Sequence, residues 1–215
     1  MKAMVALLNP NGFRYKLDEI ERRFNQTNNI SSLEQLDFMI FPETQLAPGE
    51  NPQVKNGTMY HARDSRARRG NSNIYLGGAT ILAKNKYKYQ TAVTAMAPAR
   101  DNTKWIEIAT TEGTWVIGAA YSRPGHIEEH IQMMEDLAED ISLIRQNEDV
   151  IGILLAGDLN CRLGKITGST TTAQNEKEST PHATCYPTQE WPCASQKKDQ
   201  KETHIHVKKA QAKGQ

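Results

Sequence analysis

The order of apolar and polar residues predicts a chain in which buried strands alternate with amphipathic helices. Short apolar runs, expected to be strands, occupy residues 4–8, 38–41, 74–83, 87–96, 105–110, 114–121 and 150–156. Elsewhere apolar residues recur every three or four positions, which is the period of one helix face. This period is carried by Leu17, Ile20 and Phe24, and later by Ile127, Ile131, Met134, Leu137, Ile141 and Ile144. The pattern predicts a mixed α/β fold in which sheets pack on each other and helices cover the outside.

Further features of the pattern locate turns and boundaries. Thr111-Glu112-Gly113 separates two strands and predicts a tight hairpin, while Gly77-Gly78 inside a strand indicates a bulge or a close approach of backbone. The polar stretch from Thr44 to Asn73 has no strand or helix period. After Gly168 large apolar residues are too sparse to bury a core. We therefore expect one domain over residues 1–168 and a polar, disordered tail over residues 169–215.

Candidate chemistry lies where the apolar runs end. Four runs finish in a polar side chain, namely Asn9, Glu43, Tyr121 and Asp158, and Asn160 follows two residues after the last of these. Alternate residues of an extended strand point to the same side, so Asp158 and Asn160 should face one crevice. In layered α/β folds functional residues collect beyond the carboxyl ends of strands. These side chains therefore describe one candidate pocket for a metal ion and a phosphate.

Each candidate has a chemical role and a plainer alternative. Glu43 offers a carboxylate to a hard cation such as Mg²⁺, which prefers one or two such oxygens with water and substrate phosphate; otherwise it is a surface glutamate. Asp158 is suited to orient or deprotonate a water, and Asn160 to donate a hydrogen bond to a phosphoryl oxygen. Local Asx-turns explain Asp158 and Asn9 equally well. Tyr121 is either a phosphate contact or an ordinary strand-end aromatic residue.

Composition adds few constraints. With 38% hydrophobic and 24% charged residues, the 215-residue chain looks globular, and its net charge of +1 points to no partner. A local basic cluster consists of Arg63, Arg66, Arg68 and Arg69. It belongs either to a loop that contacts phosphate or to a solvated loop. No apolar run suits a signal peptide or a membrane span, so we expect an intracellular location, nuclear or cytoplasmic. The three cysteines suit reduced thiols.

Two apparent zinc patterns are rejected. The segment from His126 to His130 has the H-x-x-E-H spacing, but a third ligand would have to come from elsewhere. Its acids are instead explained by the positive end of a helix dipole. The second possible ligand set is Cys185, Cys193, His204 and His206. Their spacing matches none of the usual pairs of zinc ligands.

Five motifs, taken in order, resemble the endonuclease/exonuclease/phosphatase superfamily, and most of all the apurinic-endonuclease-like domains of non-long-terminal-repeat (non-LTR) retrotransposons. The motifs are Leu8-Asn9 with Asn11-Gly12, Pro42-Glu43-Thr44, Gly77-Gly78-Ala79-Thr80, Tyr121-Ser122-Arg123-Pro124 and Gly157-Asp158-Leu159-Asn160. They fall within residues 3–168. The resemblance implies a four-layered α/β/β/α sandwich of the deoxyribonuclease I type, which hydrolyses phosphodiesters with Mg²⁺ or Mn²⁺.

The resemblance also implies a role for each candidate residue. Glu43 matches the metal-binding acid, and Asn9 matches its neighbour in the metal and phosphate site. Asp158 matches the residue that positions the attacking water, Asn160 the transition-state donor and Tyr121 the phosphate contact. The implied partner is DNA, in which a nick leaves a 3′ hydroxyl that primes reverse transcription. A reverse-transcriptase portion of a parent polyprotein is a further implied partner.

The tail departs from the superfamily pattern. Members carry a further acid and a terminal Ser-Asp-His, and nothing in residues 169–215 matches either. The segment also lacks the apolar strands that complete the second sheet, which predicts an incomplete sheet with an open edge. We therefore expect a DNA-nicking endonuclease of impaired activity. The alternative is a non-catalytic remnant, or a weak nucleic-acid-binding fragment, of a decayed or mispredicted retroelement gene.

Overall fold

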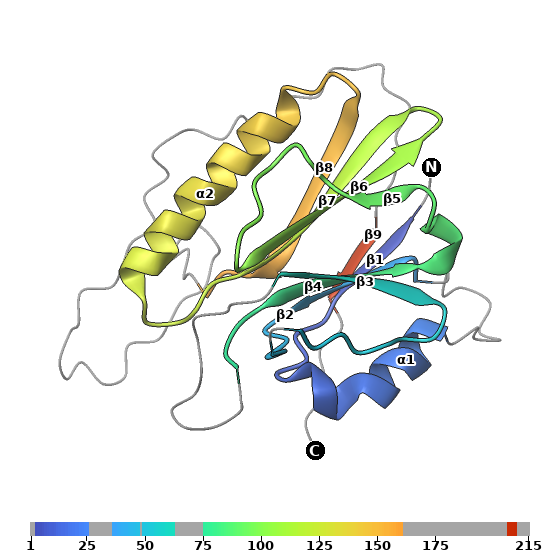
Figure 1. The fold of residues 1–215 in the computed structure, drawn as a ribbon, viewed down its shortest axis with the longest axis vertical. Helices are drawn as coiled ribbons and strands as arrows, with labels where there is room; N and C mark the ends of the chain where they lie inside the picture. The colour runs from blue at the N-terminus through green and yellow to red at the C-terminus, as the bar shows by residue number, and fades with distance from the viewer. Residues whose placement is uncertain (1–2, 26–35, 48, 63–74, 161–205, 210–215) are drawn as a thin grey trace.

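The computed structural model describes residues 3–25, 36–47, 49–62, 75–160 and 206–209, which form two β-sheets and two α-helices (Figure 1). The helices are α1 (Leu17–Asn25) and α2 (Ile127–Arg145), and the short 3₁₀ turns are η1 (Phe13–Lys16) and η2 (Asn85–Tyr87). The strands are β1 (Met4–Leu7), β2 (Phe38–Pro42), β3 (Gly57–Ala62), β4 (Ala79–Lys84), β5 (Thr91–Val93), β6 (Thr103–Thr110), β7 (Gly113–Tyr121), β8 (Val150–Asp158) and β9 (His206–Lys209). The first sheet has the order β3-β4-β2-β1-β9, and the second has the order β5-β6-β7-β8.

Three layers of apolar side chains hold these elements together. Between the sheets, Phe38 and Ile81 of the first sheet pack in one cluster with Ile106 of the second. Outside the first sheet, Ile20 and Phe24 anchor α1, while α2 covers the second sheet from the other side (Figure 1). Burying side chains of this size stabilises the fold by about 1.5–3 kcal/mol each. The order helix, sheet, sheet, helix confirms the predicted α/β/β/α sandwich.

Strand direction places the candidate residues at one end of the sandwich. β1 runs parallel to β2, and β7 runs parallel to β8, so the carboxyl ends of each pair lie together. Asn9 follows β1 and Glu43 follows β2, whereas Tyr121 and Asp158 are the last residues of β7 and β8. Tyr121 lies directly opposite Asp158 in the strand register. The mouth of the sandwich at these strand ends is therefore the place to look for a site.

Several expected elements have different bounds. The predicted hairpin is confirmed, since β6 and β7 pair along their whole length. β3 lies inside the polar stretch that showed no period. Most of its residues are half-buried, so apolar and polar residues do not alternate, and the strand is stabilised by its pairing with β4. The strand expected over residues 87–96 was too long. It is reduced to β5, because Tyr87 instead closes η2 and stacks on Phe38.

Helix α2 buries most of the predicted apolar face but not its N-terminal end, since Leu137 and Ile144 are buried with Met134 and Ile141 packed beside them. The expected apolar stripe included Ile127 and Ile131, but these residues are 45% and 52% exposed. The buried face contains Leu137 and also an acid, Asp140, whose carboxylate accepts a hydrogen bond from Nε1 of Trp105. The prediction was therefore wrong only for Ile127 and Ile131, and it did not include Asp140 because a polar anchor of this kind leaves no trace in an apolar period.

The tail expected over residues 169–215 lies mostly outside the described residues. Within it, β9 pairs in parallel with β1 at the edge of the first sheet. This strand departs from the expectation of an unstructured tail; strand pairing satisfies backbone groups and needs no apolar side chains. Among the described strands β8 has β7 as its only neighbour, which agrees with the expected incomplete second sheet.

The described helices do not include a candidate for crossing a bilayer. α1 is too short for this, and α2 carries too many charged residues.

Candidate active site

Asn9 joins the two candidate carboxylates at the mouth of the sandwich. Its amide nitrogen Nδ2 lies 3.3 Å from Oε2 of Glu43 and 3.3 Å from Oδ2 of Asp158, and donates to both. Glu43 follows a strand of the first sheet and Asp158 ends a strand of the second, so this one amide bridges the two layers. The structure therefore brings together three residues that the sequence assigned to one pocket.

Local turns at these strand ends leave one polar atom of each side chain for the site. Oδ1 of Asn9 accepts from the backbone N–H of Asn11 at 2.9 Å, and Oδ1 of Asp158 accepts from the backbone N–H of Asn160 at 3.1 Å. These are the local turns that were the plainer explanation of both residues. The turn and the site do not exclude each other, because the second polar atoms of the two side chains, Nδ2 of Asn9 and Oδ2 of Asp158, bond each other between the sheets.

Glu43 lies in an unusual backbone conformation that neighbouring segments hold. Its φ is 55°, in the left-handed region that residues with large side chains rarely adopt, and Gln45 has a φ of 56°. The carbonyl of Glu43 accepts from the N–H of Gly12 at 3.3 Å, and that of Thr44 accepts from the N–H of Phe13 at 2.9 Å. Strained residues persist only where the surroundings fix them, and they concentrate at functional sites.

Gly77 and Gly78 support the same loop from the other side. The N–H of Thr44 donates to the carbonyl of Gly78 at 3.3 Å, and the N–H of Gln45 donates to that of Gly77 at 2.9 Å. Both glycines have positive φ, 81° and 82°, which a residue with a Cβ adopts only at a cost. The close backbone approach predicted at this pair is confirmed, and its purpose is to hold the loop that carries Glu43.

Replacing Gly78 with alanine is expected to lower the free energy of unfolding by about 1–3 kcal/mol and to displace the Glu43 loop. An added Cβ would lie 2.7 Å from Oγ1 of Thr44, in addition to the strain of its φ. Gly125→Ala is the matched control, because Gly125 has a φ of 80° but nothing within 4 Å of the added atom. Urea unfolding of both variants measures the difference. Equal losses would show that the contact with Thr44 contributes nothing.

Tyr121 and Asn160 lie at different depths of the mouth. Tyr121 is only 4% exposed and belongs to the core between the sheets. Asn160 is exposed, has a φ of 48°, and donates from Nδ2 to the backbone carbonyl of Ser122 at 2.7 Å. Asn160 is therefore the outer of the two residues and is already oriented by a backbone group.

Gln45 is a further polar residue of the site that the sequence analysis did not single out. Its Nε2 lies 3.3 Å from Oδ1 of Asn11 and 3.4 Å from Oε1 of Glu43. Each oxygen of Glu43 is thus held by an amide, one by Asn9 and the other by Gln45. The sequence offered only the position two residues after Glu43, and a loop residue at that spacing has no predictable direction. We refer to Asn9, Glu43, Gln45 and Asp158 as the acid–amide cluster.

The donor set of the acid–amide cluster fits a hard divalent cation. Within the described part of the chain, Glu43 and Asp158 form no ion pair with lysine or arginine, and their hydrogen-bond partners here are neutral amides and a backbone N–H. Both carboxylates approach the same amide nitrogen of Asn9, so a cation placed there could be reached by oxygens from both sheets. Mg²⁺ and Mn²⁺ suit such oxygen ligands. The described residues contain no cluster of three His, Cys, Asp or Glu, so water and substrate would complete the coordination.

Other residues named in the sequence lie elsewhere. The basic cluster Arg63, Arg66, Arg68 and Arg69 and all three cysteines fall outside the described residues. His126 caps the start of α2, and His130 in its first turn shares a hydrogen bond of 2.9 Å with Oγ of Ser122. The side chain of His130 thus reaches Ser122, next to the end of β7.

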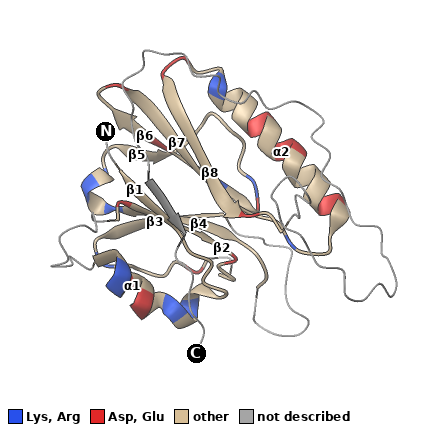
Figure 2. Cartoon of the chain, turned by 180° about the vertical axis from the view of Figure 1, so that it is seen from behind, with Lys and Arg blue, Asp and Glu red and all other residues tan. Residues whose placement is uncertain are grey.

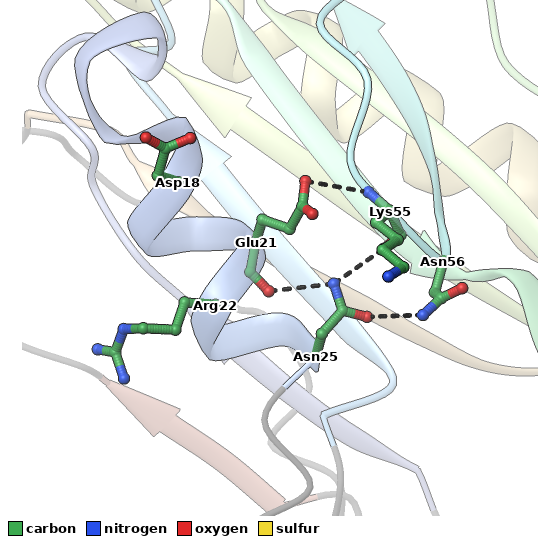
Figure 3. A pocket seen from close by; sticks show the side chains of 6 residues that line it. All are labelled: Asp18, Glu21, Arg22, Asn25, Lys55 and Asn56. Carbon is green, nitrogen blue, oxygen red and sulfur yellow. Dashed lines mark hydrogen bonds between the residues drawn. The ribbon is translucent and has the colours of Figure 1, made fainter.

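A separate hollow lies at the opposite end of the first sheet (Figure 3). It is lined by Asp18, Glu21, Arg22, Asn25, Lys55 and Asn56. Lys55 and Asn56 precede β3, which begins opposite Lys84, the last residue of β4. Glu43 follows β2, which ends opposite Ala79, the first residue of β4. The hollow and Glu43 therefore lie at opposite ends of β4. The polar groups of the hollow bond one another, since Glu21 accepts from the N–H of Lys55 and Asn56 donates to Asn25. This hollow has no connection with the acid–amide cluster.

The fold and the cluster define a four-layered sandwich with an acid–amide site at the strand ends. Neither a family model nor a curated protein matches the sequence. Solved structures do match. A 3′-5′ exonuclease (NExo) from Neisseria meningitidis is 12% identical, with 74% of this chain and 58% of that chain covered and a TM-score of 0.48. The endonuclease domain of TRAS1, a telomere-specific non-LTR retrotransposon, is 11% identical, with 73% and 59% covered and a TM-score of 0.42.

A third match is TDP2 from D. rerio complexed with a single-strand DNA product, at 13% identity, with 76% and 63% covered and a TM-score of 0.44. All three have the exonuclease/endonuclease/phosphatase fold, the fold of the group that the five motifs resemble. This chain spans 58% to 63% of the length of these structures. At such identities and TM-scores the likeness concerns the arrangement of layers and says nothing about activity.

Proposed function

We propose that this chain is a divalent-metal-dependent phosphodiesterase that nicks DNA, of the kind found in the endonuclease domains of non-LTR retrotransposons. The observation that carries the proposal is the bridge from Asn9 to both Glu43 and Asp158. It supports a single site built from both sheets, at the strand ends where the motifs of the superfamily fall. Two carboxylates and several amides are the groups that a metal-bound phosphodiester needs around it.

Each residue has a distinct part in this proposal. Glu43, fixed by the amides of Asn9 and Gln45, holds the divalent cation, which when bound polarises a phosphoryl oxygen as a Lewis acid. Asp158 orients the attacking water and accepts its proton. Asn160 donates an N–H to the phosphoryl oxygen whose negative charge rises in the transition state. Tyr121 contributes its hydroxyl to the phosphate from the deeper side of the mouth.

The charges support an approach of DNA at the strand ends and not over α2. The acids of α2 stand out on its exposed turns (Figure 2), and they include Glu128, Glu129, Glu135 and Glu139. A surface of this sign repels the phosphate backbone. By contrast, β3 ends at Ala62 beside the start of β4, at the same end of the sheet as Glu43. The basic cluster follows Ala62 directly in the sequence, and we assign it to phosphate contacts.

We further propose that the activity of this 215-residue chain is weak. The additional acid and the Ser-Asp-His of the superfamily pattern have no counterpart in residues 169–215. Groups that act as a unit on a phosphoryl transfer do not contribute independently, so their absence costs orders of magnitude in rate. A reverse-transcriptase portion of a parent polyprotein is the partner that would use the 3′ hydroxyl left by the nick.

Removal of the metal tests the proposed function. With Mg²⁺ or Mn²⁺ we expect slow conversion of supercoiled plasmid to open circles, complete loss of this conversion with EDTA, and recovery when metal is added in excess. Asp158→Asn, purified in parallel, controls for a contaminating nuclease, because it keeps the shape of the side chain and removes its charge. Equal nicking by the two proteins would reject catalysis at this site. Binding of labelled duplex without nicking would favour the nucleic-acid-binding remnant.

A further inference from the structure

Ser122 connects three elements at the rim of the site. Its backbone N–H donates to the carbonyl of Asp158 at 2.9 Å, and its carbonyl accepts from Nδ2 of Asn160 at 2.7 Å. Its hydroxyl shares a hydrogen bond of 2.9 Å with Nδ1 of His130 in the first turn of α2. The residue is only 3% exposed. Each polar group of Ser122 is therefore engaged, two with the segment that carries Asp158 and Asn160 and one with the helix.

The bond to Ser122 decides which way the amide of Asn160 points. A primary amide has two N–H donors on one end and a carbonyl acceptor on the other. The carbonyl of Ser122 can accept only from the nitrogen end, since the opposite orientation would set two carbonyl oxygens against each other. One N–H of Asn160 is used in this bond. The second N–H is fixed in the plane of the same amide and is directed by it.

His130 holds Ser122 from outside the sheet. Ser122 follows the last residue of β7, and the pairing of β7 with β8 ends one residue earlier, at Tyr121. The strand ladder therefore does not fix the carbonyl of Ser122, although the N–H reaches Asp158. The hydroxyl-to-imidazole bond supplies a second attachment, to a helix that is packed on the second sheet. Removal of either partner takes this second attachment away from the residue that orients Asn160, and leaves the bond from its N–H to Asp158.

We infer that Ser122 and His130 form a positioning pair that sets the direction of the Asn160 amide toward the substrate phosphate. The inference rests on the proposed function, in which Asn160 is the transition-state donor. Ser122 and His130 are not themselves expected to touch the substrate. They act through the carbonyl of Ser122, so their effect should fall on the rate of the chemical step and not on the binding of DNA.

The orientation of Asn160 is tested directly by NMR of the side-chain amides, with the Asn160 signals assigned from their loss in Asn160→Asp. Ser122→Ala and His130→Leu are expected to shift these signals and to bring the two N–H resonances closer together. His130→Asn is expected to restore them, because its amide reaches the place of Nδ1. Ser142→Ala, at an exposed serine of α2, is the matched control. His130 is only half-buried, so its variants also serve if Ser122→Ala does not fold.

The kinetic test uses the plasmid-nicking assay on the same variants. Ser122→Ala and His130→Leu are expected to lower kcat by about 3- to 10-fold, the equivalent of one hydrogen bond, with KM unchanged and with rescue by His130→Asn. Asn160 signals that do not change in these variants would overturn the inference whatever the activity. Changed signals with an unchanged kcat would also overturn it. A wild-type chain that does not nick at all would reject the proposed function, while the NMR signals would still decide whether the pair orients Asn160.

Discussion

Replacing Glu43 with alanine is expected to lower metal-dependent nicking by at least about 100-fold, because it removes the carboxylate assigned to the cation. The same change should leave the free energy of unfolding nearly unchanged, because the Glu43 side chain makes only two long amide contacts, at 3.3 and 3.4 Å. Lost activity without lost stability is the signature of a residue that serves the site. Plasmid nicking with Mn²⁺ and urea unfolding, measured on the same preparations, check the two parts.

Glu135→Ala is the control for this prediction, because Glu135 is an exposed acid in the middle of α2 and has no part in the acid–amide cluster. It removes the same charge from the chain and should leave nicking unchanged. If Glu43→Ala and the wild-type chain nick equally, the acid–amide cluster is not the catalytic site. If Glu43→Ala unfolds at markedly lower urea than Glu135→Ala, the carboxylate has a structural part that the proposed function does not include.

Replacing Asp140 with alanine is expected to cost about 3–5 kcal/mol of stability, the largest loss predicted for a single residue of this protein. Asp140 is fully buried and accepts from Nε1 of Trp105 at 2.9 Å and from Nη2 of Arg100 at 2.9 Å. Burial opposes the charge of Arg100, but its hydrogen bonds with Asp140 and Glu139 outweigh this and raise its pKa. Without Asp140 the indole N–H of Trp105 loses its buried acceptor, and Arg100 keeps only its more exposed partners Asp136 and Glu139.

Glu139→Ala is the matched control, because the Glu139 carboxylate contacts the same guanidinium at 2.6 Å with its side chain 62% exposed. Exposed ion pairs contribute about 0–1 kcal/mol, so the two neighbouring acids should differ several-fold in their effect. Urea unfolding followed by Trp fluorescence measures both. Comparable losses from the two variants would show that the buried acid is no more than a surface partner of Arg100.

The fold could be predicted largely from local patterns. The amphipathic α1, the hairpin of β6 and β7 and the apolar run of β8 each depend on a period or a turn within a few residues of sequence. β3 could not be found in this way, because its half-buried residues are held by pairing with β4 and do not alternate. On α2 the apolar period found Leu137 and Ile144 of the buried face but not Asp140, because such a period cannot anticipate a buried acid that accepts from Trp105 and Arg100.

The candidate site, like the fold, was predictable from sequence only where local features determine it. The sequence by itself determined that Asn9, Glu43 and Asp158 follow apolar strands, because strand ends and turn-forming residues are local features. Only the tertiary structure decided that one amide of Asn9 reaches both carboxylates, that Gln45 holds the free oxygen of Glu43, and that Ser122 orients Asn160. These are hydrogen bonds between segments remote in the chain, or between side chains of loops. Their geometry is set by how two sheets and a helix pack, and no local pattern of residues encodes that packing.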